Sequence, residues 1–99
     1  MTEIVDDLRA ARALIDTEDK WAANGFERFA HKRTGGERLC AVDAVNHCED
    51  PRRRREMWAA LRKLIHEPVS AFNDTHSHAD IMALFDRAIA TALTKDTPQ

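Results

Sequence analysis

Four consecutive arginines, Arg52–Arg55, are the residues of this sequence best suited to binding an anion. They follow Asp50-Pro51, a pair typical of a helix N-cap and the first helical residue, so we expect them on the first turn of a helix. Positive charge at that end opposes the helix dipole by roughly 0.3–1 kcal/mol per cation. We therefore expect compensation, either from an anionic partner or from nearby carboxylates such as Glu49, Asp50 and Glu56.

Two further cations follow on the same predicted helix. The candidate nucleic-acid-binding set is Arg52, Arg53, Arg54, Arg55, Arg62 and Lys63. The whole sequence, however, has 15 lysines and arginines against 17 aspartates and glutamates, and this net charge of -2 provides no general attraction for a polyanion. No turn followed by a base-reading helix accompanies the run. Solvated or intramolecularly paired arginines are thus favoured, and a nucleic-acid-binding accessory factor is the alternative.

Cysteine and histidine side chains could hold a metal or act as nucleophiles, but their spacing favours neither. Cys40, His47 and Cys48 fall in one predicted helix, and His76 and His78 lie near the start of another. The two cysteines would be about 80° apart around that helix and ~12 Å apart along it, too far for a disulfide or for one metal ion. We predict no metal, no cofactor and no catalytic residue, with Cys40 buried for structural reasons.

The stretch 73–78 combines Asn, Asp, Thr, His and Ser side chains, which commonly tie loops to helix ends. Ser77 with Asp80 three residues later is an acidic variant of the capping box. Capping is therefore the favoured interpretation, and catalysis by Asp74 with His76 or His78 is the alternative.

Apolar periodicity predicts the elements that must position these side chains. Helical spacing of apolar residues predicts helices at about 3–16, 37–48, 51–66 and 77–94, with Trp21 folded back onto the core and a connector before Ser77. Residues 25–36 suit either a short β-hairpin or an irregular loop. The prediction is a mainly α protein: a compact four-helix single domain over residues 1–94, with a frayed C-terminal tail at 95–99.

Length and composition narrow the setting of the protein. The 99 residues are 43% hydrophobic and 32% charged, which is an ordinary globular balance. The N-terminus carries acids where a signal peptide needs positive charge, and no apolar run reaches the 18 or so residues that span a bilayer. We expect a cytoplasmic protein that does not enter a membrane.

Four segments together show a family pattern: LRAARALI, RLCAVDAV, AFND and IMALFDRAIA. Over about residues 8–90 the chain resembles a family of small bacterial and phage domains of unknown function, family number 6197. The residues that match its pattern are Trp21, Cys40, Ala41, Asn73, Asp74, Phe85, Asp86, Ala88 and Ile89. The resemblance implies a helical fold and no particular activity, and it suggests that Asn73, Asp74 and Asp86 form one polar cluster.

The absence of enzyme motifs favours a small non-enzymatic protein-binding or regulatory module, possibly a homodimer. Such a module would dock a helix face onto another protein, and Phe26, Phe29 and Trp58 are apolar residues that could line the interface. A small hydrolase or metal enzyme built around the cysteines and histidines is a less favoured third class.

Overall fold

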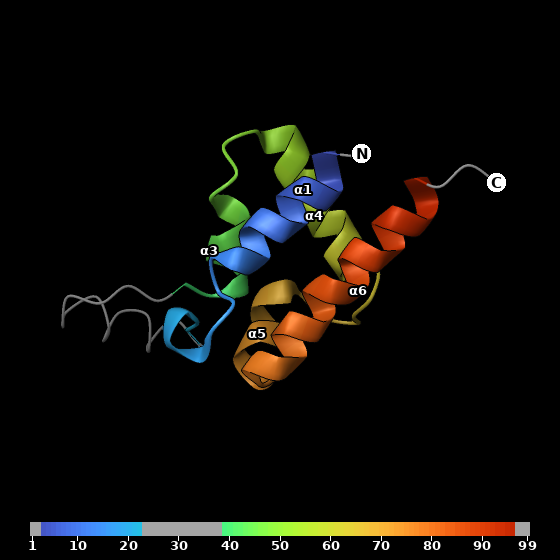
Figure 1. The fold of residues 1–99 in the computed structure, drawn as a ribbon. Coiled ribbons are helices and arrows are strands. Elements are labelled where there is room, and N and C mark those ends of the chain that lie inside the picture. Colours follow the sequence, from blue (N-terminus) through green and yellow to red (C-terminus); the bar gives the residue numbers. More distant parts are fainter. Residues whose placement is uncertain (1–2, 23–38, 97–99) are drawn as a thin grey trace.

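The computed structural model describes residues 3–22 and 39–96, and this part of the chain is helical without strands. The elements are α1 (Glu3–Ala13), the 3-10 turn η1 (Glu18–Lys20), α3 (Ala41–Asn46), α4 (Pro51–Arg62), α5 (Val69–Thr75) and α6 (His78–Asp96), as Figure 1 shows. The predicted mainly α fold is confirmed, with five α-helices in the described ranges instead of four. The stretch at 25–36, with Phe26 and Phe29, lies outside the described residues.

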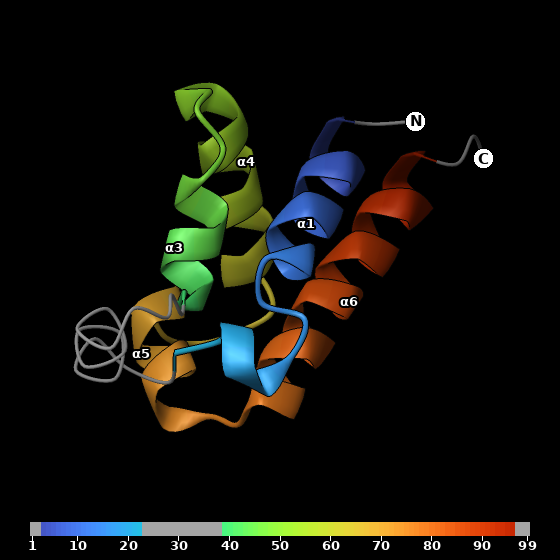
Figure 2. The same ribbon diagram turned by 60° about the vertical axis from the view of Figure 1, so that its left-hand side comes forward.

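Helices α1 and α6 make the most extensive helix pair of the fold. They run antiparallel, so that both chain ends leave on the same side in Figure 2. Val5, Leu8 and Ala11 form the buried stripe of α1 at helical spacing. The largest fully buried apolar side chains come from this pair, from α4 and from the turn after α1: Phe85, Leu8, Ile15, Met57, Leu61 and Ile81.

The start of α6 carries the predicted capping box. The Asp80 backbone N–H donates to Ser77 Oγ at 3.2 Å, and the Ser77 N–H donates to Asp80 Oδ2 at 3.5 Å. Two backbone donors that have no partner within the helix are satisfied in this way. The local signal therefore places the longest helix correctly.

The connector predicted before Ser77 is instead a helix, α5, which follows Pro68. Its buried residues Val69 and Asn73 are four apart and so lie on one face. Seven residues are too few to display a convincing apolar period, which is why the sequence pattern missed it. Pro68 is thus the N-cap of α5, while α4 already ends at Arg62.

Asn73 of α5 forms hydrogen bonds with two other segments of the chain, one at residues 21–22 and one at residue 41. Its Oδ1 accepts from Trp21 Nε1 at 2.7 Å and from the Ala41 backbone N–H at 2.9 Å, and its Nδ2 donates to the Ala22 carbonyl at 2.9 Å. Trp21 is 8% exposed and belongs to the core, as predicted. A parallel bridge joins Trp21 to Leu39, so the residues that flank 23–38 are held side by side.

None of the helices within 3–22 and 39–96 combines the length and apolar character needed to cross a membrane.

Candidate functional site

The arginine run begins α4, as the sequence predicts. Asp50 is the N-cap, and its Oδ1 accepts from the Arg52 backbone N–H at 2.9 Å. Pro51 occupies the first helical position, where its missing N–H costs nothing. All four arginine side chains therefore start from the electropositive end of a helix.

Two of the four arginines are paired with carboxylates of α1. Arg53 Nε donates to Asp7 Oδ2 at 2.9 Å, and Arg53 Nη2 donates to Asp7 Oδ1, so the pair is bidentate. Glu3 lies 3.4 Å from Arg52 Nη2 and 3.9 Å from Arg53 Nε. The hydrogen bonds to Asp7 raise the pKa of the Arg53 guanidinium above its usual range. The compensation expected for this helix end thus comes mainly from α1, with Glu56 as an additional partner of Arg52 at 3.9 Å.

The remaining cations of α4 have no carboxylate partner in the described part of the chain. Arg54 Nη1 donates to the Cys48 backbone carbonyl at 2.7 Å, which uses one of its donors and leaves its charge uncompensated. Arg55, Arg62 and Lys63 are exposed, and no ion pair within residues 3–22 and 39–96 involves them. Of the six candidate cations, two are thus paired with carboxylates and four have no carboxylate partner among residues 3–22 and 39–96.

Three unpaired arginines surround Trp58. Arg54, Trp58 and Arg62 follow one another at intervals of four residues, and Arg55 lies three residues before Trp58. Side chains at these intervals are neighbours on a helix surface. Trp58 is only partly buried against the core. We call the four residues Arg54, Arg55, Trp58 and Arg62 the Trp58 face.

Arg52 and Lys63 lie elsewhere on the circumference of α4. At 100° per residue, Lys63 is about 100° from Arg62 and about 20° from Arg52, on the side that faces away from Trp58. Three members of the predicted set therefore lie on the same side of α4 as Trp58, and the other three lie elsewhere around the helix. Sequence reasoning did not identify Glu3 and Asp7 as the carboxylates that pair with Arg52 and Arg53. Their four-residue spacing, which places them on one face of α1, is the signal that could have indicated them.

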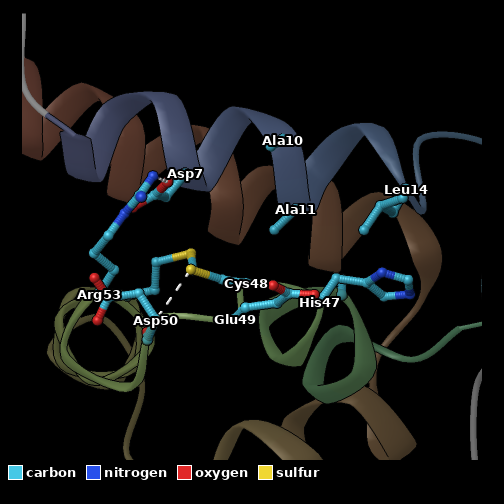
Figure 3. A pocket seen from close by; sticks show the side chains of 11 residues that line it. Asp7, Ala10, Ala11, Leu14, His47, Cys48, Glu49, Asp50 and Arg53 are labelled. Carbon is cyan, nitrogen blue, oxygen red and sulfur yellow. Dashed lines mark hydrogen bonds and ion pairs between the residues drawn. The ribbon is translucent and has the colours of Figure 1, made fainter.

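A cleft of about 410 Å³ lies between α1 and the junction of α3 with α4. In Figure 3 the Arg53–Asp7 pair stands at one end of it, Cys48 lies between, and His47 lies at the other end below Leu14. The Cys48 thiol donates to the Asp50 carbonyl at 3.8 Å.

Cys40 is a helix cap and not a residue inside a helix. The prediction of one helix over 37–48 is wrong at this point, because α3 begins at Ala41 with Cys40 as N-cap. Cys40 Sγ accepts from the Asp43 N–H at 3.5 Å, and Asp43 Oδ2 accepts from the Cys40 N–H at 3.3 Å. Burial raises the pKa of the Cys40 thiol, and the neighbouring Asp43 carboxylate adds to the rise. A protonated thiol suits capping, since it donates to Asp43 Oδ2 at 3.4 Å, but is a poor nucleophile.

The histidines near α6 make structural contacts. His76 stacks on Phe72 with ring centroids 3.8 Å apart, and its Nδ1 donates to the Phe72 carbonyl at 3.0 Å. His78 Nε2 donates to the Ile15 carbonyl at 2.8 Å. Among the described residues no group of three or more histidines, cysteines, aspartates and glutamates could hold a metal ion.

The structure places Asn73, Asp74 and Asp86, the residues of the suggested polar cluster, in different surroundings. Asn73 is fully buried with Trp21 and Ala41, while Asp74 is exposed. Asp86 pairs with Arg12 of α1 at 2.7 Å, and its side chain is 58% exposed. The environments differ because Asn73 of α5 faces the core, whereas Asp86 of α6 is exposed beside α1.

A second cleft, of about 220 Å³, lies where α4 ends against α5 and α6. Its walls are Leu64, Ile65, Phe72, His76, Asp80, Ala83, Leu84 and Arg87. No sequence signal points to it, because its residues come from three separate segments. We call it the Phe72 cleft.

Comparison with known proteins adds one relationship. Residues 1–91 match the model of a family described as a family of unknown function, DUF6197. No curated protein and no solved structure matches the chain.

Proposed function

We propose a protein-binding function for this chain, which belongs to the DUF6197 family, a family of unknown function. The protein is a small non-enzymatic module that engages an acidic partner protein through the Trp58 face. The proposal depends on how the arginines of α4 are paired. Carboxylates of α1 pair with Arg52 and Arg53. Arg54, Arg55 and Arg62 have no carboxylate partner in the described ranges and lie on the same side of α4 as the half-buried Trp58.

The chemistry of this face suits recognition. Guanidinium groups bind carboxylates in a bidentate manner, and tryptophan and arginine are the residues most enriched among the strong contacts of protein interfaces. The ion pair between Arg53 and the buried Asp7 carboxylate supports this face, because it holds the first turn of α4 against α1. Both cysteines are free thiols, which favours a reducing compartment such as the cytoplasm as the place of this function.

Two probes test the proposal by amide NMR at low salt: a glutamate-rich peptide and a single-stranded oligothymidylate. We expect the peptide to shift resonances of residues 54–65. The double variant Arg55→Glu/Arg62→Glu should abolish these shifts. Arg9→Glu/Lys63→Glu is the matched control, because it makes the same change in net charge at exposed cations away from Trp58.

The proposal would be contradicted if both double variants reduced the peptide-induced resonance shifts equally. It would also be contradicted if the peptide did not bind. Preferential binding of the oligothymidylate to the Trp58 face would replace the acidic protein with a nucleic acid, which is the alternative function.

A further inference from the structure

We infer that the partner docks as a short acidic segment carrying one bulky apolar side chain, and that this side chain occupies the Phe72 cleft. The inference rests on the proposed function and specifies the chemistry of its partner. It combines two features of the fold, the cations of the Trp58 face and the cleft at the end of α4.

The Trp58 face continues into the cleft. After α4 ends, the Leu64 N–H donates to the Leu61 carbonyl at 3.1 Å and the Ile65 N–H donates to the Arg62 carbonyl at 3.3 Å. These bonds keep the chain turning in the sense of the helix. Ile65, three residues after Arg62 and seven after Trp58, therefore extends the same side of α4, and it forms a wall of the cleft.

The cleft has the size for one large apolar side chain, and part of its lining is apolar. Leu64, Ile65, Phe72, Ala83 and Leu84 contribute apolar surface. Its volume of about 220 Å³ exceeds the roughly 150 Å³ of a cavity that accepts benzene. Two charged residues also line the cleft: exposed Arg87 has no ion pair in the described ranges, and the Asp80 carboxylate accepts from the Ser77 N–H.

The extent of the positive surface favours a short acidic peptide over a nucleic acid. Arg54 and Arg62 are eight residues apart, which is ~12 Å along a helix. The face offers three guanidinium groups, whereas DNA-binding proteins often make 6–10 phosphate contacts. Exposed Glu49 precedes the same helix and would repel a longer polyanion, while a short acidic segment avoids it.

A selection from a random peptide library against the intact protein tests the inference. We expect enriched peptides to combine aspartates or glutamates with one Leu, Ile, Phe or Trp. Ala83 is exposed and lines the cleft, so Ala83→Gln should fill the cleft without disturbing the core and weaken binding about tenfold. Ala90→Gln is the matched control, at another exposed alanine of α6 outside the cleft.

The outcomes separate the two proposals. If Arg55→Glu/Arg62→Glu abolishes peptide binding but Ala83→Gln leaves it unchanged, the Phe72 cleft does not hold the apolar side chain. The proposed function would still stand. Failure to enrich any peptide, or enrichment of peptides without acids, would overturn both. Analytical ultracentrifugation tests for self-association. If the protein self-associates and Arg55→Glu/Arg62→Glu abolishes this, the occupant is a second copy of the chain, and the inference of a segment from another protein is overturned.

Discussion

Arg53 and Asp7 form a bidentate ion pair between α4 and α1, although they are 46 positions apart in the chain. The Asp7 side chain is 8% exposed, whereas that of Arg53 is 36% exposed. The carboxylate is therefore the member that depends more on its partner, and the pair holds the start of α4 against the α1–α6 core.

Replacing Asp7 with Asn should destabilise the protein. The change removes the charge that compensates Arg53 and weakens two charge-assisted hydrogen bonds, so we expect a loss of about 1–3 kcal/mol in the free energy of unfolding. Urea denaturation measures the loss. Asp6→Asn is the control, because Asp6 is the exposed neighbour. Equal stability of the two variants would show that the pair is dispensable.

Replacing Asn73 with Ala should cost more, about 2–4 kcal/mol, because it leaves three buried partners unsatisfied: Trp21 Nε1, the Ala41 N–H and the Ala22 carbonyl. Fluorescence of Trp21 in a Trp58→Phe background reports the loss of this contact directly. Asp74→Ala, at the adjacent exposed position, should leave both the stability and the fluorescence of Trp21 unchanged. An unaltered Trp21 spectrum in Asn73→Ala would contradict the arrangement.

The Cys40 cap should make stability depend on alkaline pH. Burial raises the pKa of this thiol above the ordinary value of 9.0, so the folded protein keeps a proton that the unfolded chain releases. The free energy of unfolding should then be fully retained below about pH 9 and fall as the pH rises above it. Cys40→Ser keeps a capping oxygen that does not titrate there, and the alkaline loss should shrink. An identical alkaline slope in both proteins would rule out a role for this thiol.

The Arg12–Asp86 pair should contribute little. Its side chains are 34% and 58% exposed, and surface pairs of this kind contribute about 0.2–1 kcal/mol. Asp86→Ala should therefore lower the melting temperature only slightly, and added salt should reduce the difference. A double-mutant cycle with Arg12→Ala isolates the pair, and a coupling energy well above this range would reveal further partners of Asp86.

Much of the helical fold follows from local sequence signals. Asp50-Pro51 starts α4, Ser77 with Asp80 starts α6, and the apolar stripes of α1 and α6 have the period of a helix. These signals work because a cap and its backbone donor lie within three residues of each other. α5 was missed since it has only seven residues, and Cys40 was misplaced since cysteine is an uncommon cap.

The sequence by itself determined the helical class, the position of the arginines on the first turn of a helix, and the need to compensate their charge. Only the tertiary structure decided which arginines are compensated, because Asp7 reaches Arg53 through the packing of α1 on α4. It likewise decided that Asn73 belongs to the core and that the Trp58 face ends in a cleft built from three segments. Spacing along a chain predicts contacts within one helix, whereas contacts between helices depend on how their buried faces pack together.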